Sequence, residues 1–473
     1  MRQLVVSSWA LGCVFAIAAC GDDGPPGGGT DTDPGPDDLT QRGSCEDAPG
    51  AGTDHMGLVS QAETWTAAGS PHRVTSDLAI KATVTIEPCA VVLLGSSVHV
   101  TVGSATEPGS IIGRGTSQLV GGVLDVRPVT FDALTPAAKW AQIIIEPKGT
   151  LDLDVAAIQN GGQPTINEPG MLVVRGVAGG PNDGVVTRSA KLTRVLLESS
   201  ASYGVNLDGW GGFDAASRKV WIRSSGGAAS PYPIRLEAGV VETLPTDLVV
   251  TGNMKDEIQL RSSKAHMRDD TFADHGVPYH VTGSLYVNAS ADGAPVKLTI
   301  AAGVTLAFED LASGITIGSS MTRQGILEAI GTAAAPIVFT SAKTSKAAGD
   351  WRNLAFRASP TTGNRVSYAR VEYAGADSQT NSFGCGPADN DGAVWIQGTG
   401  GDQGAPSAAF IDQTTFDHIA GTTVIVSGWI DDAGPNFSPT NTFGAATPSC
   451  KVSRPRRTGA GDVCDGGRTT CWP

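Results

Sequence analysis

The chain contains the same series of short strand-like patterns twice, about two hundred residues apart. With a shift of 207 residues, Pro71 lies over Pro278, and after small insertions Trp140 lies over Trp351. Apolar, Gly, Pro and Trp positions recur in the same order between these landmarks, so the match goes beyond similar composition. We interpret the chain as an internal duplication, and any fold must accommodate two copies of one long pattern.

Within each copy, the pattern is one of short β-strands. Residues 298–308, LTIAAGVTLAF, show four- to seven-residue runs in which apolar and small or polar side chains alternate, with breaks at Gly, Pro or Asp. An alternation with period two and frequent turns predicts strands. Since no helix-length segment with a 3.6-residue period separates the runs, hairpins or stacked solenoid turns must pair them.

Four segments carry a resemblance to a known family. LTIAAGVTLAF (298–308), APIVFTS (335–341), GDWRNLAF (349–356) and VSYARVEYAG (366–375) resemble recurring phrases of right-handed parallel β-helix lipoproteins on Gram-negative cell surfaces. The resemblance covers roughly residues 64–450 and implies an all-β, right-handed parallel β-helix; most members of such families have no assigned activity. The alternative fold is a tandem pair of β-sandwiches. At about 22 residues a turn, the solenoid would have about 18 turns and a length of roughly 85 Å.

The first residues indicate export and a lipid anchor. Arg2 precedes an apolar run at 4–19 that ends in Ile-Ala-Ala-Cys. This segment resembles the lipobox of bacterial lipoproteins, which implies cleavage before Cys20, acylation of that residue and a location at the outer membrane, facing the periplasm or the cell surface. The alternative is an ordinary secretory signal with an incidental cysteine.

The remaining pattern divides the chain into segments. Residues 20–43 are rich in Gly, Pro and Asp and predict a disordered tether, because they cannot bury enough surface to offset the entropy of ordering. Apolar alternation continues between the two copies, so the connecting residues should form further solenoid turns. The predicted segments are a signal peptide at 1–19, a tether at 20–43, an N-terminal cap at 44–63, a first repeat at 64–229, connecting turns at 230–270, a second repeat at 271–450 and a Cys-containing tail at 451–473.

Six cysteines remain after the signal and the acylated residue are set aside. An exported compartment permits disulfides, but fifteen connectivities are open to six cysteines. A bond between Cys45 and Cys89 would pin the N-terminal segment to the first turns, and a bond between Cys464 and Cys471 would close a small C-terminal loop. The two further candidates are Cys385 and Cys450.

Composition narrows the range of partners. The formal net charge is −14 and the pI about 4.9, which argues against nucleic acid and against an anionic membrane surface. We expect contact with the membrane through the lipid anchor only, a monomer, no cofactor and no metal. A polysaccharide or a surface protein is the expected ligand.

Catalytic residues are weakly indicated. Enzymes that act on polysaccharides need clustered carboxylates facing one side of the molecule. The minority candidates are Asp389, Asp391, Asp412 and Asp417, of which Asp389 and Asp391 are also weak candidates for a metal site. These aspartates are not shared between the two copies, so the residues that recur are those that build the fold.

Two functional hypotheses follow from these patterns. The first is a cell-surface lipoprotein whose β-helical scaffold has a structural or adhesive binding role without catalysis. The second is a polysaccharide-active enzyme, a lyase or glycoside hydrolase, that uses carboxylates of the second repeat.

Overall fold

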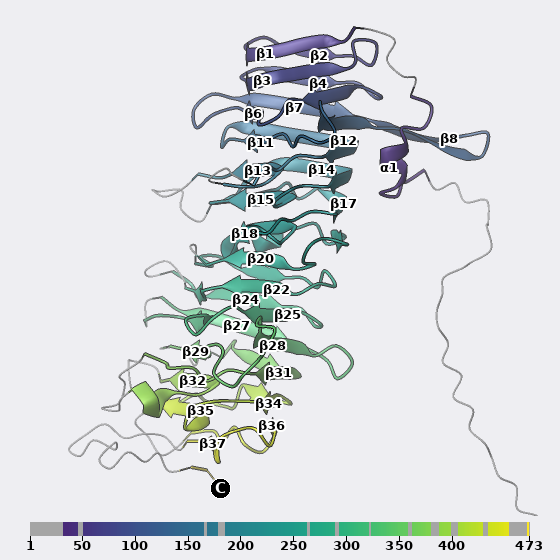
Figure 1. The fold of residues 1–473 in the computed structure, drawn as a ribbon. Helices are drawn as coiled ribbons and strands as arrows, with labels where there is room; N and C mark the ends of the chain where they lie inside the picture. The colour runs from purple at the N-terminus through teal and green to yellow at the C-terminus, as the bar shows by residue number, and fades with distance from the viewer. Residues whose placement is uncertain are drawn as a thin grey trace, which may run out of the picture.

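The fold is a right-handed parallel β-helix with three short strands in each turn. The structure is a computed structural model and describes residues 32–45, 51–164, 168–177, 185–262, 265–288, 293–320, 323–357, 362–379, 387–398, 405–428, 434–453 and 471–472. Figure 1 shows a rod with β1 (Thr53–Val59) at one end and β37 (Cys450–Val452) at the other. The predicted fold class is confirmed, and the alternative of tandem β-sandwiches is wrong.

One side of the rod, which we call the long face, is an unbroken parallel ladder. Its strands, in stacking order, are β1, β3 (His72–Ile80), β6 (His99–Val102), β11 (Gln142–Ile145), β13 (Leu172–Arg175), β15 (Val205–Asp208), β18 (Ile234–Glu237), β20 (Ile258–Arg261), β22 (Tyr279–Thr282), β25 (Thr305–Phe308), β28 (Ile337–Ser341), β31 (Ala369–Glu372), β34 (Thr415–Asp417) and β36 (Thr442–Phe443).

The solenoid has fewer turns than the sequence predicts, and some of its turns contain many more residues. Ile258 and Tyr279, which are partners on neighbouring turns, are 21 residues apart, whereas Arg370 and Thr415 are 45 residues apart. Fourteen strands with a spacing of about 4.8 Å give a rod of about 60 Å along the long face. The prediction of about 18 turns and roughly 85 Å is therefore wrong, because insertions between strands consume chain without adding turns.

The first copy contributes two further faces. The channel face stacks β2 (Glu63–Trp65), β4 (Thr83–Ile86), β7 (Gly109–Arg114), the first halves of β12 (Gly149–Gln159) and β14 (Thr187–Glu198), and β16 (Gly211–Phe213). The third face stacks the first half of β3, β5 (Val91–Leu94), β10 (Val129–Ala133), the second halves of β12 and β14, β17 (Arg218–Arg223) and β19 (Val249–Thr251).

The second copy has its own two additional sheets. A five-stranded sheet contains β21 (Asp270–Phe272), β24 (Val296–Ile300), β27 (Gly325–Ile330), β30 (Arg365–Ser367) and β33 (Ile411–Asp412). A six-stranded sheet contains β23 (Ser284–Val287), β26 (Gly314–Ile317), β29 (Leu354–Phe356), β32 (Val394–Gln397), β35 (Thr423–Gly428) and β37. The elements outside the turns are α1 (Asp38–Gln41), the hairpin of β8 (Thr116–Val120) and β9 (Val123–Arg127), and the 3₁₀ segments η2 (Ala238–Thr243) and η3 (Pro387–Asn390).

Equivalent residues of the two copies have equivalent structural roles. The indole Nε1 of Trp140 donates to the carbonyl of Gln159 at 2.8 Å, and Nε1 of Trp351 donates to the carbonyl of Glu372 at 2.7 Å. Both tryptophans are fully buried, and each indole bonds to the last residue of a strand, β12 in the first copy and β31 in the second. The recurrence of tryptophan therefore reflects packing at a corner, as the duplication predicts.

The two copies are nevertheless out of phase by one strand. The shift of 207 residues places β22 over the first half of β3, which belongs to the third face of the first copy. In the structure, β22 stacks on β20 and so continues the long face, which the second half of β3 begins. The second copy is thus rotated by a third of a turn about the rod axis relative to the first.

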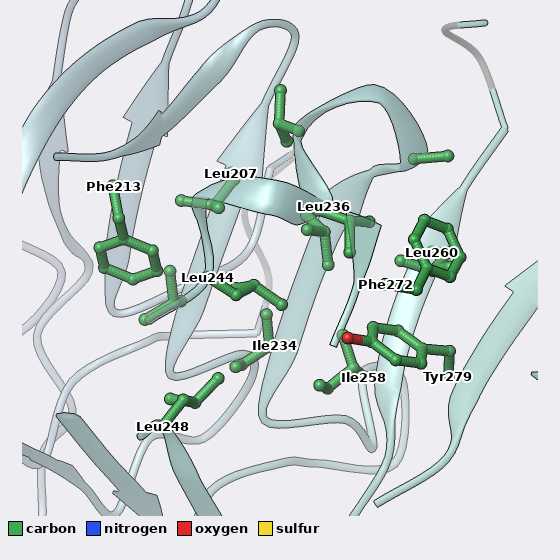
Figure 2. Packing of buried hydrophobic residues seen from close by; sticks show 14 of the residues in the cluster. Leu207, Phe213, Ile234, Leu236, Leu244, Leu248, Ile258, Leu260, Phe272 and Tyr279 are labelled. Carbon is green, nitrogen blue, oxygen red and sulfur yellow. The ribbon is translucent and has the colours of Figure 1, made fainter. Parts of the chain in front are cut away.

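The core is a continuous column of apolar side chains inside the coil. Alternation sends every second residue inward, as in β18 and β20, whose Ile234, Leu236, Ile258 and Leu260 pack together in Figure 2. Leu244, which follows η2, belongs to the same cluster. The column runs through both copies and the connecting strands as one cluster, so residues 230–270 form solenoid turns rather than a flexible linker.

The end of the predicted tether is docked against the third face. Leu39 of α1 is fully buried in a cluster with Val126, Val155, Ala157 and Leu196, where Trp221 also packs. Asp33 pairs with Arg194 and Lys219, and Asp37 with Arg223. The predicted disordered tether at 20–43 is therefore wrong for residues 32–43. One large aliphatic side chain and two acidic groups order this segment, although its composition predicts disorder.

Disulfides join each end of the chain to the rod. Cys45 bonds to Cys89, which is one of the predicted pairings. Cys450 bonds to Cys471, so the suggested pairing of Cys471 with Cys464 is wrong. Close to the second bond, Ser453 and Cys471 form an antiparallel bridge, which lays the end of the chain against the last turn. The other cysteine candidates, Cys20, Cys385 and Cys464, lie outside the described residues.

Candidate functional site: a hydroxyl-lined channel

Four hydroxyl side chains form a row on the outer surface of the channel face. Thr83 is the register partner of Ser110, and Ser110 is the partner of Thr150. The register of β12 and β14 makes Ser189 the next member of the row. Because neighbouring parallel strands lie about 4.8 Å apart, the hydroxyl groups repeat at nearly that spacing along the rod.

The row lies at the base of two adjoining pockets. Their volumes are about 210 and 260 Å³, and both are lined by Ser110 and Thr150, so that together they form one shallow channel along the rod. We call this feature the hydroxyl channel. Its cationic lining residues are Lys81, Lys148, Arg188 and Lys191.

Most of these cations are neutralised by carboxylates. The Nζ of Lys81 is 3.6 Å from Glu107, and an Nη of Arg188 is 2.6 Å from Glu242. The exposed side chain of Lys148 has no ion-pair partner among the residues that the structure describes. The channel is therefore close to neutral in charge, with one available cation at the end near β4.

The hydroxyl groups have unused capacity for hydrogen bonds. Thr150 Oγ1 donates to Ser110 Oγ at 2.9 Å, which leaves further donor and acceptor positions on the exposed Thr150. Ser189 is only 7% exposed, and its Oγ is covered and has no hydrogen-bond partner among the residues that the structure describes. The hydroxyl groups open to a ligand are therefore those of the less buried Thr83, Ser110 and Thr150.

The carboxylates in the channel are arranged for charge balance. Asp152 accepts a hydrogen bond from Arg114 and lies 3.5 Å from the ammonium of Lys191. Asp214 accepts a hydrogen bond from the backbone N–H of Ala216. A glycosidase needs a protonated carboxyl group that donates a proton to the scissile bond and a second carboxylate on the other side of that bond. Asp152 is paired with two cations, and such pairing suits a binding surface better than proton donation.

A second polar cluster lies on the outer surface of the long face. His280 Nδ1 is 3.0 Å from Glu257, and its Nε2 is 3.0 Å from the hydroxyl of Tyr232. Tyr203 continues the cluster by donating to Gln259 at 2.7 Å. A carboxylate, an imidazole and a phenol in sequence form a potential proton relay.

Burial prevents this relay from acting on a large substrate. Tyr232 is 6% exposed and His280 only 4%, and the ammonium of Lys255 lies over the Tyr232 ring. Burial raises the pKa of Tyr232 well above its ordinary value, so the group stays a neutral phenol. The hydrogen bond from His280 lowers the pKa of Glu257. The cluster therefore fixes loops against the long face with its imidazole and phenol covered, while the Glu257 side chain keeps 29% of its surface exposed.

Three of the four predicted aspartates have separate structural partners. Asp412, at the end of β33, pairs with Arg365 at 2.6 Å and accepts from Ser367. Asp417, at the end of β34, accepts from the backbone N–H of His418 at 2.9 Å. Asp391 accepts from the backbone N–H of Ser378 at 2.7 Å, and the side chain of Asp389 lies outside the described residues. Their joint catalytic role stays a prediction.

Among the described residues, no group of three or more His, Cys, Asp or Glu side chains is placed to hold a metal ion. The weak metal candidates Asp389 and Asp391 stay a prediction, since the side chain of Asp389 lies outside that part of the chain. We derive no chemistry through a metal.

Sequence reasoning missed the hydroxyl channel, although a signal exists. In four successive strands of the channel face, a Ser or Thr stands one residue before the first inward apolar residue: Thr83-Val84, Ser110-Ile111, Thr150-Leu151 and Ser189-Ala190. Only the three-dimensional register aligns these positions, because successive ones are 27, 40 and 39 residues apart, with strands and loops of unequal length between them.

The fold defines the class of this protein as a parallel β-helix, with a shallow polar channel along its outer side. A family model described as a pectate-lyase-like β-helix domain matches residues 265–390, which are similar to that domain. No curated protein and no solved structure matches the chain. The matched segment begins in the last connecting turns and lies mostly in the second copy, whereas the hydroxyl channel lies in the first.

Proposed function

We propose that this protein is a lipid-anchored, non-catalytic scaffold that binds polysaccharide in the hydroxyl channel. The observation that carries the proposal is the row formed by Thr83, Ser110, Thr150 and Ser189 at the base of a channel along the rod. A stretched pyranose chain presents hydroxyl groups at a repeat similar to the strand spacing, so successive sugars meet successive turns of the solenoid.

Binding can be tested with the full acylated protein in detergent micelles on a glycan array, followed by calorimetry with the best ligand. Thr150→Val should weaken binding about 3- to 10-fold, the equivalent of one net hydrogen bond. Thr305→Val, which changes the same atoms on the long face, is the matched control and should leave affinity unchanged. Equal affinity of the Thr150→Val variant and the native protein would contradict the proposal.

The anchor rests on the sequence around Cys20. None of the helices in the described part of the chain is long and apolar enough to cross a membrane. Metabolic labelling with an alkyne fatty acid should modify the native chain and spare Cys20→Ser, and fractionation should place the native chain in the outer membrane. Labelling of both chains to the same extent would disprove acylation at Cys20.

The second candidate function is a polysaccharide-active enzyme. The similarity of residues 265–390 to a pectate-lyase-like β-helix domain favours it. A reducing-sugar assay with polygalacturonate and the glycans that bind on the array separates the two functions. Release of sugar that disappears in Asp391→Asn would establish catalysis in the second copy, and binding without release supports the scaffold.

A further inference from the structure

The hairpin of β8 and β9 leaves the rod and ends in an uncharged apolar tip (Figure 1). Leu119, Val120 and Val123 are exposed by 38%, 54% and 71%, and all residues from 115 to 124 are uncharged. Gly121 and Gly122 make the turn with positive φ angles of 61° and 84°, and open space surrounds both. An exposed group of large apolar side chains at the end of a projection indicates a contact surface.

The hairpin is not needed to close the solenoid. In the first copy it is inserted between β7 and β10, whereas the second copy connects the equivalent strands β27 and β28 with residues 331–336 alone. The chain therefore carries a projecting element that the fold does without, and its exposed tip requires a role of its own.

The base of the hairpin touches the N-terminal segment. Ser117 Oγ donates to the carbonyl of Thr32, and Asp125 accepts from the backbone N–H and the hydroxyl of Ser44. Eleven residues, 21–31, lie between the proposed acylated cysteine and Thr32. At no more than about 3.6 Å a residue, that length of chain holds the hairpin base within about 40 Å of the lipid surface.

We infer that the hairpin tip, residues 119–123, inserts into the lipid surface to which the N-terminus is anchored. The inference rests on the proposed acylation of Cys20. The tip has the chemistry of an interfacial anchor, because its apolar side chains gain free energy on leaving water and no charged group has to be desolvated with them. With a net charge of −14, the protein gains no general attraction to anionic lipid, so the partner is a zwitterionic or neutral surface.

Tryptophan fluorescence in vesicles tests the inference. The full acylated protein carrying Val120→Trp is reconstituted into phosphatidylcholine vesicles with and without brominated acyl chains. The native spectrum is subtracted from that of the variant to isolate the added tryptophan. This difference spectrum should be blue-shifted in vesicles and should lose intensity when the lipid is brominated. The matched control is Leu311→Trp, at a site that is 59% exposed in the second copy and away from the hairpin; its emission should not change.

The outcomes separate this inference from the proposed anchor. Native protein that fails to float with the vesicles would disprove the anchor. Protein that floats while Val120→Trp is no more quenched than Leu311→Trp would overturn tip insertion alone. A blue shift without vesicles, together with a doubled mass in light scattering, would identify a second copy of the chain as the occupant and also overturn it.

Discussion

A single left-handed residue shows how the two copies diverged. Cys89 has φ of 67° and stands where the second copy has Gly303, with φ of 88°. A side chain in this conformation is strained, and the first copy tolerates it because the disulfide to Cys45 requires a cysteine there. The sequence alignment alone predicts the equivalence, since Cys89 interrupts an otherwise matching pattern at a turn glycine.

This strain can be measured once the disulfide is removed. In a Cys45→Ser background, Cys89→Gly should be more stable than Cys89→Ala by about 1–2 kcal/mol, because glycine adopts positive φ without the steric cost. Chemical denaturation of the two double variants gives the difference. If the alanine variant is equally stable, the left-handed geometry at this turn is incorrect.

The relay on the long face predicts a pH dependence. The pKa of Glu257 is lowered below its ordinary value of 4.5, mainly by the hydrogen bond with His280. The carboxylate therefore stabilises the fold above about pH 4.5, and this contribution is lost as the pH falls through the lowered folded-state pKa. Glu257→Gln should show a smaller loss of unfolding free energy between about pH 5 and pH 3 than the native protein. Parallel slopes for the two proteins would contradict the assignment.

At the scale of elements, the docked N-terminal segment is held by one side chain and a few ion pairs. Leu39→Ala should release residues 37–43, because removal of a buried leucine side chain costs about 2–5 kcal/mol and the segment has few other apolar contacts. Hydrogen exchange of the amides in this segment should accelerate, while exchange in β12 and β14 stays slow. Leu311→Ala, at an exposed site, is the control.

Salt should act on the same segment. Asp33 and Asp37 pair with Arg194, Lys219 and Arg223 at the partly exposed surface of the third face, where ions screen the attraction. Exchange of these amides should therefore be faster at 1 M than at 0.1 M salt. An unchanged rate would show that these ion pairs contribute nothing measurable to the docking.

The elements divide into those that sequence can predict and those that it cannot. Strands such as β24 and β25 follow from alternation that is visible in the local sequence, and the buried corner positions of Trp140 and Trp351 follow from their recurrence. The hydroxyl channel and the docking of Leu39 depend on which residues meet across turns of 21 to 45 residues. Loop lengths set that register, and nothing in the local pattern reports them.

At the scale of the whole molecule, the fourteen strands of the long face predict a rod with an axis of about 60 Å for a single chain. Small-angle scattering of the protein in amphipol, without detergent, should give a rod of that length. The hairpin should appear as a lateral projection. A particle of twice the volume would contradict the prediction of a monomer.

The rotation between the copies limits what duplication contributed to this molecule. Had the second copy continued in phase, the sheet of β21, β24, β27, β30 and β33 would extend the channel face along one line. The displacement by one strand turns that sheet toward a different side. Its outer residues also differ, since Lys297 and its register partner Ile326 stand where the first copy has Thr83 and Ser110. A straight polymer lying in the hydroxyl channel would therefore end with the first copy.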